Sequence, residues 1–206
     1  MPAGEASLNV LFPADDLEHL SETKRRILRA ASEAFDRYSV RRTSMEDVAR
    51  IAGISRQTIY RNFQSKEELV AAVSELKSRA ITQAVRRNTA RLRDPRRKIE
   101  VAILTCVEQL VGDRQTRELL ECSYEELIIR SKRPEVVAEI TARWQPILTE
   151  AAKAGVLRPA LDMAEVISWL TDIELLAAMR VLVTGQTVSA VWRQLDSLVM
   201  EGLCRR

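Results

Sequence analysis

The sequence predicts an all-α protein of about nine helices, and three observations support this prediction. Ala, Leu, Glu and Arg dominate the composition, and these residues favour helices. The 206 residues include only six Gly and six Pro, which leaves few turn residues for a many-stranded sheet. Apolar residues recur at spacings of three and four along most of the chain, which is the period of an amphipathic helix.

The first 20 residues are expected to form a flexible N-terminal arm. They contain Pro2, Gly4 and Pro13, and their four acidic residues meet no Lys or Arg, for a net charge of −4. The first helix is then expected at Ser21, a favourable N-cap residue followed by Glu22 in the first turn. Its apolar stripe predicts that it ends near Tyr38 and Ser39.

Two short helices are predicted next. Thr43 and Glu46 have the spacing of a capping box, so a helix is expected to begin there and to end at Gly53. Ser55 can cap a third helix, from Arg56 to about Asn62. The residues expected to point inward are Met45, Val48, Ala49, Ala52, Ile54, Ile59 and Phe63.

The rest of the chain also has helical patterns. Ser65 and Glu68 form a second possible capping box, which opens a long fourth helix. Later helices are expected from Asp94-Pro95 to Gly112, over about 114–130, from Pro134 to Ala154 with a kink at Pro146, from Asp162 to Thr184, and over about 187–203.

Residues 43–63 have the order of a helix-turn-helix: a helix, a tight Gly turn and a short helix whose exposed side is polar. Residues 21–66 carry eleven Lys and Arg against five Asp and Glu, a net +6 on a chain of net charge +3. A compact basic segment is typical of a nucleic-acid-binding domain, although a solvated helical hairpin has the same simple pattern.

The segment from Thr23 to Val73 resembles the tetracycline-repressor (TetR) family of bacterial regulators. The resemblance rests on Ile27-Leu28-x-Ala30-Ala31 with Phe35, on Thr43-Ser44-Met45-Glu46-Asp47-Val48-Ala49 with Ala52-Gly53-Ile54-Ser55, and on Thr58-Ile59-Tyr60-x-x-Phe63-x-Ser65-Lys66-Glu67-Glu68-Leu69. It implies a DNA-binding domain over 21–66 and an effector-binding and dimerisation domain over 67–206. The function it implies is a sequence-specific transcriptional regulator, by family tendency a repressor that a small effector releases from a palindromic operator.

The resemblance also assigns roles to residues. It places the base contacts at the start of the third helix, on Arg56, Gln57, Thr58 and Tyr60, whose side chains can bond or touch base edges. Phosphate contacts are expected from Arg41, Arg42, Thr43, Ser44, Arg61, Asn62 and Lys66. Tyr60 could serve in both roles, and Arg41 and Arg42 could equally be solvated without touching DNA.

Two basic or unusual segments fit the resemblance less well. Many family members have Gly in the turn after the first helix, where this chain has Tyr38-Ser39-Val40-Arg41-Arg42. A second basic run, residues 86–98, has seven Lys and Arg and one Asp. We expect it to be a solvated junction between helices, with DNA contact as the alternative.

The last two helices are expected to bind a second copy of the chain. The helix over 163–184 is apolar nearly all round, so it must be buried on more than one side. The resemblance implies a four-helix interface in a homodimer, which places two recognition helices about 34–36 Å apart, one turn of DNA. The candidate interface residues are Leu170, Leu176, Val181, Val188, Val191, Trp192, Leu195, Leu198 and Val199.

Effector binding follows from the resemblance alone, and a member without any effector is an alternative. The candidate pocket residues of the central helices, each of which could instead be plain core, are Leu104, Val107, Tyr124, Leu127, Ile128, Trp144, Leu148, Trp169 and Ile173. Because few polar residues lie near them in the sequence, an apolar effector is expected.

Composition and motifs argue against other classes of protein. The six Gly form neither a dinucleotide fingerprint nor a phosphate loop, and the single histidine, His19, lies in the arm, so no enzyme and no cofactor is expected. The three Cys are far apart and show no metal-ligand spacing, which fits a cytoplasmic protein without a metal. No membrane-spanning segment is expected. The remaining alternative is a helical protein-interaction module that does not bind DNA.

Overall fold

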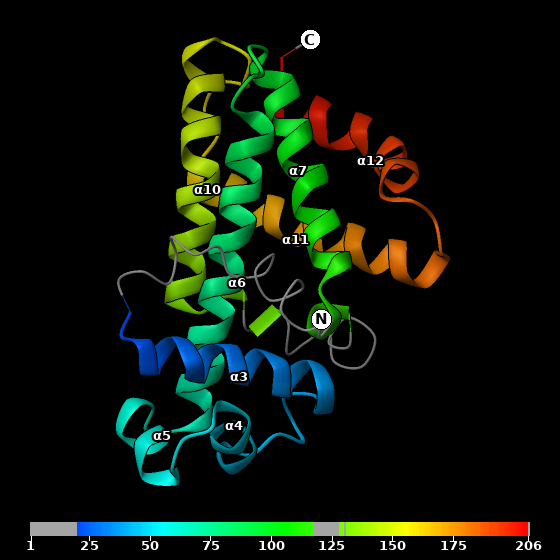
Figure 1. Cartoon of the computed structure of the whole chain (residues 1–206). Helices are drawn as coiled ribbons and strands as arrows, with labels where there is room; N and C mark the ends of the chain where they lie inside the picture. Colours follow the sequence, from blue (N-terminus) through cyan, green and yellow to red (C-terminus); the bar gives the residue numbers. More distant parts are fainter. Residues whose placement is uncertain (1–19, 118–127, 130, 206) are drawn as a thin grey trace. The chain divides into compact units, whose positions relative to one another are not determined.

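A computed structural model describes residues 20–117, 128–129 and 131–205, and it confirms the all-α class. Within this part of the chain every regular element is a helix, apart from one isolated bridge between Leu157 and Cys204. The chain divides into two compact units, the first ending at Ala80 and the second beginning at Ile81 (Figure 1). Residues 1–19 of the expected N-terminal arm, His19 included, lie outside the described residues, and Leu20 packs against the core of the first unit.

The first unit contains α3 (Glu22–Tyr38), α4 (Met45–Ala52), α5 (Arg56–Asn62) and the first part of α6 (Lys66–Thr89). In Figure 1, α3 lies across α4 and α5. The apolar faces of all four helices meet in one core, because residues three and four apart share a helix face. This core includes Ile27, Ala31, Phe35, Val48, Ile59, Leu69 and Val73.

The limits of these helices follow local sequence features. The Ser21 side chain accepts a hydrogen bond from the Lys24 N–H at the start of α3, as predicted. The Ser65 hydroxyl likewise accepts from the Glu68 N–H, but the Glu68 carboxylate accepts from the Gln64 N–H, so that the expected capping box forms only in part. The division between the units falls 14 residues beyond the expected limit at Lys66, because the first turns of α6 supply core residues to the first unit.

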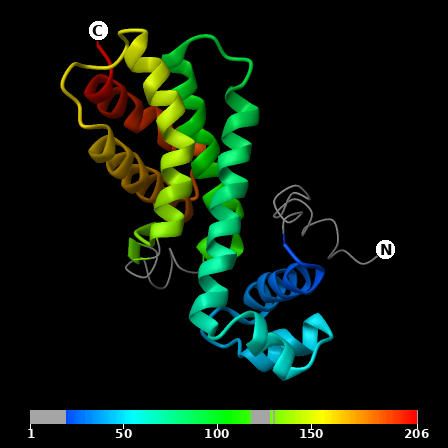
Figure 2. The same ribbon diagram turned by 90° about the vertical axis from the view of Figure 1, so that its left-hand side faces the viewer.

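The second unit contains the end of α6 together with α7 (Pro95–Gly112), α10 (Pro134–Lys153), α11 (Met163–Thr184) and α12 (Val188–Leu203). The helix expected over 114–130 begins at residue 114, and most of it lies outside the described residues. In the second unit α7 and α10 lie side by side (Figures 1 and 2), and α11 crosses behind them in Figure 1. α11 contacts α7, α10 and α12, so it is the central helix of this unit.

Candidate nucleic-acid interface

The turn between α4 and α5 holds the two helices at a fixed crossing. Gly53 has φ +64°, a left-handed conformation that glycine adopts without a steric penalty. The Ile54 N–H donates to the Ala49 carbonyl, which closes the turn. The Arg26 guanidinium of α3 donates to the Ala52 carbonyl at 2.7 Å and would lie 3.3 Å from a Cβ at Gly53. A side chain at position 53 would therefore disturb the link between α3 and the turn.

The start of α4 differs by one residue from the sequence-based expectation. Ser44, not Thr43, is the N-cap residue, and it forms a capping box with Asp47 rather than Glu46. Hydrogen bonds from the Ser44 hydroxyl and backbone N–H, and then from Arg50, lower the pKa of Asp47 to about 2.

Because the helix cap is Ser44, the hydroxyls of Thr43 and Ser44 have different roles from those expected. Thr43 is buried, and its hydroxyl donates to the carbonyls of Ser39 and Ala34, which disfavours the predicted phosphate contact by its side chain. Ser44 is half-buried, and its hydroxyl donates to the Asp47 carboxylate at 2.6 Å. The positive end of the α4 dipole still favours an anion at this helix end.

The recognition helix α5 has one buried residue and a row of exposed polar ones. Its N-cap Ser55 accepts a hydrogen bond from the Thr58 N–H, and Ile59 is fully buried in the core. The side chains on the opposite side are exposed, and they belong to Arg56, Gln57, Tyr60 and Arg61. Thr58 is half-buried, and its hydroxyl lies 2.9 Å from the Ser55 hydroxyl. Burial of Ile59 therefore fixes which side of α5 faces outward.

Two neighbouring side chains orient Arg56 in the absence of DNA. Its Nε lies 3.1 Å from a Glu46 carboxylate oxygen, and its guanidinium lies over the Tyr60 ring, 5.5 Å from the ring centre. Glu46 was expected to cap α4, and only the packing of α4 against α5 shows this second role. An arginine held in one direction loses less conformational entropy when it binds a guanine edge.

The other predicted phosphate contacts surround this helix. Arg41, Arg42 and Arg61 are exposed. The Lys66 ammonium donates to the Arg41 carbonyl at 3.3 Å, and the Asn62 amide donates to the Thr58 carbonyl, so these two side chains already have partners within the first unit. The second basic run, at the end of α6 and the start of α7, belongs to the second unit.

Comparisons with known proteins agree with this geometry. Residues 27–73 match the model of the family described as bacterial regulatory proteins, tetR family. The chain is 25% identical over 195 residues to the HTH-type transcriptional repressor KstR2 of Rhodococcus jostii, covering 93% of this chain and 96% of that protein. It is 29% identical over 153 residues to the HTH-type transcriptional regulator TtgR of Pseudomonas putida, covering 70% and 73%. Residues 27–73 therefore match the tetR-family DNA-binding region, and the chain is similar over nearly its whole length to a transcriptional regulator.

Comparison with a solved structure shows that the similarity of fold extends over nearly the whole chain. The fatty acid degradation regulator FadR from Bacillus halodurans aligns with a TM-score of 0.71 and 17% identity, covering 92% of this chain and all of that one. KstR2 and TtgR are both named as transcriptional regulators. Among the described residues no His, Cys, Asp and Glu side chains gather as a metal site, and no helix is long and apolar enough to cross a membrane.

The candidate effector residues fall into three groups. Val107, Trp144 and Leu148 are buried in the core of the second unit, and Leu104, Ile128 and Ile173 pack against it. Tyr124 and Leu127 lie outside the described residues. Trp169 is 67% exposed and lies at the surface of α11, apart from the buried candidates. A cavity of about 410 Å³ lies between α10 and the start of α11, and none of the candidates lines it.

The candidate dimer residues also divide by exposure. Leu170, Val181, Val191, Trp192 and Val199 are at most 8% exposed within one chain, so they belong to its own core and offer little surface to a partner. Leu176 is 41% and Leu198 73% exposed, and Val188 and Leu195 are half-buried. Sequence analysis missed Val183, which is 78% exposed on the same helix as Leu176.

Sequence analysis also missed a buried polar group in the second unit. Arg143 of α10 and Glu174 of α11 are 5% and 2% exposed. One feature of the sequence could have drawn attention to Glu174, because it is an acidic residue within the almost wholly apolar run from Ile173 to Ala178. The sequence contains nothing that links it to Arg143, 31 residues earlier, because this proximity depends on the packing of α10 against α11.

Proposed function

We propose that the chain is a homodimeric repressor that binds a palindromic operator through α5 and leaves it when a small effector binds the second unit. The observation that carries the DNA-binding part is the exposed row of Arg56, Gln57, Tyr60 and Arg61 on a helix whose other side is fixed by buried Ile59. Arg and Gln can each form two hydrogen bonds to one purine edge in the major groove. Binding to a bacterial operator would place this activity in the cytoplasm.

A palindromic operator requires a two-fold dimer, and the surface of α11 supports dimerisation. Trp169, Leu176 and Val183 of α11 are spaced by seven residues and are all exposed, so they form an apolar stripe along one side of the helix. A stripe of this kind on a single chain is expected to be covered, and a second copy covers it with two-fold symmetry. The relative KstR2, which spans nearly the whole chain, is named a repressor, and this favours repression over activation.

The experiment is a fluorescence-anisotropy titration of the full chain with genomic fragments, beginning with the region upstream of its own gene. The test variant is Arg56→Ala/Tyr60→Ala, and the matched control is Arg91→Ala/Arg93→Ala, which removes two exposed cations from the second basic run. Each protein is measured at about 50 and 200 mM salt, because neutralised phosphates make binding salt-dependent.

We expect one fragment to bind best, and the test variant to bind it at least about tenfold more weakly. The control is expected to retain the preference. Equal binding to all fragments would leave only a nonspecific basic surface. A folded dimer that binds no DNA at low salt would contradict the proposal and favour a protein-interaction module.

A further inference from the structure

Glu46 is an exposed acidic residue in the part of the chain that is proposed to bind DNA. It lies in the first turn of α4, and 48% of its side chain is exposed. A carboxylate close to DNA is repelled by the phosphates, which lowers the affinity for any sequence. The other acid of this turn, Asp47, forms the capping box with Ser44, so capping accounts for Asp47 and not for Glu46.

The partner of Glu46 is Arg56, which belongs to a different helix. A carboxylate oxygen of Glu46 lies 3.1 Å from Arg56 Nε. The ion pair of Asp47 with Arg50, by comparison, joins residues three apart on the surface of α4. The pair of Glu46 and Arg56 instead links α4 to the recognition helix α5 at the residue predicted to contact a base.

The position of this ion pair determines which donors of Arg56 remain for DNA. A guanidinium has five N–H groups, one on Nε and two on each Nη atom. Because Glu46 engages the Nε side, the N–H groups of the two Nη atoms remain. Two parallel N–H groups match the O6 and N7 acceptors of guanine, and no other base presents two acceptors in the major groove.

The surroundings of Arg56 favour a base over a phosphate as its partner. The Glu46 carboxylate repels a phosphate that approaches Arg56, whereas the edge of a guanine carries no net charge. The guanidinium also lies 5.5 Å from the centre of the Tyr60 ring, a second contact that restricts its rotamers. The Arg56 side chain remains 71% exposed, so a base edge can reach it.

We propose that Glu46 is a specificity-determining residue, which positions Arg56 to bind one guanine in each half-site of the operator. Glu46 acts through Arg56: its carboxylate holds Nε, and the two Nη atoms donate to O6 and N7 of the base. This inference rests on the proposed operator binding through α5. It adds the base that Arg56 recognises and the residue that directs Arg56 to it.

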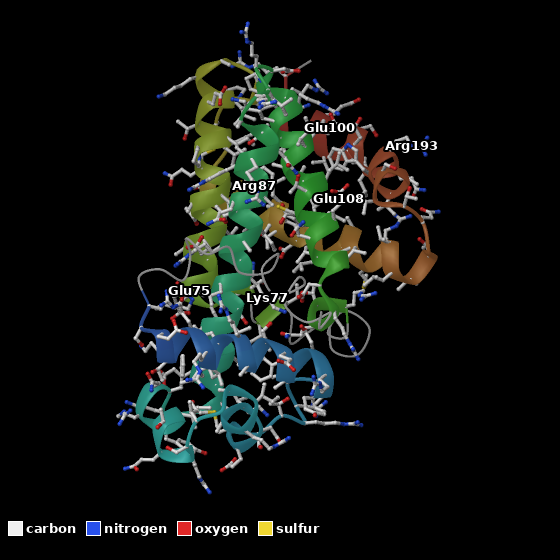
Figure 3. All side chains as sticks on the ribbon, viewed as in Figure 1. Glu75, Lys77, Arg87, Glu100, Glu108 and Arg193 are labelled. Atoms are coloured by element: carbon white, nitrogen blue, oxygen red, sulfur yellow. The ribbon has the colours of Figure 1, made fainter. Side chains whose placement is uncertain are left out.

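The test begins with selection of DNA duplexes by the full chain from a library with about 30 random base pairs, enough for two half-sites one turn apart. The most enriched duplex and its single-base-pair substitutions are then titrated by fluorescence anisotropy. Glu46→Ala removes the carboxylate, Glu46→Gln retains an accepting oxygen, and Arg56→Ala removes the proposed base contact. The matched control is Glu75→Ala, which removes a carboxylate that pairs with Arg79 on α6 (Figure 3).

We expect the wild type to bind a G·C pair at one position of each half-site at least about tenfold more tightly than any other base pair. Arg56→Ala should abolish this preference. Glu46→Ala should reduce it by about threefold to fivefold, because an ion pair exposed to solvent has a modest strength. Glu46→Gln and Glu75→Ala should retain the preference.

Affinity for a nonspecific duplex separates positioning from a structural effect. Glu46→Ala should bind such a duplex at least as tightly as the wild type does, since it removes a charge that repels phosphates. Equal weakening of every duplex by Glu46→Ala would indicate a damaged DNA-binding unit and would overturn the proposal. An unchanged preference in Glu46→Ala would also overturn it, as would a preference for a base pair other than G·C at the position that Arg56→Ala affects.

The selection also distinguishes this inference from the proposed function. Enrichment of one sequence that depends on Arg56 but not on Glu46 would overturn this inference and leave operator binding through α5 intact. Enrichment of no sequence by the folded wild-type protein would overturn the proposed function, and this inference with it.

Discussion

Ser39 shows how one residue can adopt a backbone conformation that its side chain disfavours. It follows α3 with φ 67° and ψ 157°, a region that is almost restricted to glycine. Its carbonyl accepts hydrogen bonds from the N–H and the hydroxyl of Thr43, so the turn into α4 holds this conformation in place. The TetR resemblance had indicated that many members have Gly near this position, and the structure retains a glycine-like turn without the glycine.

Ser39→Gly is expected to stabilise the protein. A residue in this region carries about 1–3 kcal/mol of strain, and glycine adds about 0.5–1 kcal/mol of unfolded-state entropy, so the net gain should be about 1 kcal/mol. Urea unfolding of the full chain measures it as a higher midpoint with an unchanged slope. Ser39→Ala retains the Cβ and should not raise the urea midpoint. Equal midpoints for wild type, Ser39→Gly and Ser39→Ala would show that the backbone at position 39 is not strained.

At the scale of the element, the start of α4 shows how closely a capped helix can be located from sequence. Thr43-x-x-Glu46 and Ser44-x-x-Asp47 both have the spacing of a cap and an N3 acid, so spacing alone does not choose between them. The packing of α3 against the turn decides, because the Thr43 hydroxyl is already bonded to the Ala34 and Ser39 carbonyls. Ser44 is then the first free hydroxyl, and the helix begins one residue later than expected.

Removal of this cap should destabilise the protein in two distinguishable ways. Ser44→Ala is expected to lower the free energy of unfolding by about 0.5–2 kcal/mol. Asp47→Asn should lose stability at neutral pH, because the folded state lowers the pKa of Asp47 to about 2 and so favours the carboxylate.

The effect of Asp47 has a defined pH window. The stabilisation is complete above the ordinary Asp pKa, about 3.9, and is lost as the pH falls towards 2. Urea unfolding at pH 7, 4 and 2.5 should therefore show a difference between wild type and Asp47→Asn that shrinks below about pH 4. A difference that stays constant down to pH 2.5 would be incompatible with the bonded carboxylate.

At the scale of the whole molecule, one side of α11 packs in the chain's own core and the other side is exposed to a possible second copy. Its sequence is apolar nearly all round, and one side packs against α7, α10 and α12. The other side carries the exposed apolar stripe of Trp169, Leu176 and Val183. Dimer formation would remove this stripe from water, at about 25 cal/mol for each Å² of apolar surface buried.

The variant Trp169→Glu/Val183→Glu should therefore be a folded monomer. Both side chains are more than two-thirds exposed in one chain, so their replacement leaves the core intact, whereas four glutamates would meet across a two-fold interface. Analytical ultracentrifugation measures the mass and circular dichroism the helix content. Val137→Glu on α10 matches Leu176 at 41% exposure and lies outside the stripe, so it should remain a dimer. A dimeric double variant would place the interface elsewhere.

The sequence by itself determined the helical class, most helix limits and the outward row of α5. These depend on local chemistry: Ser21, Ser55 and Asp162 bond N–H groups within three residues, and buried Ile59 sets the outward side of a seven-residue helix. Tertiary structure decided which residues of a wholly apolar helix stay exposed. Trp169 and Trp192 have the same side chain, yet one is 67% and the other 6% exposed. It also decided that Arg143 and Glu174 are buried in the second unit, because burial of a polar residue depends on how the helices pack and leaves no periodic pattern in the sequence.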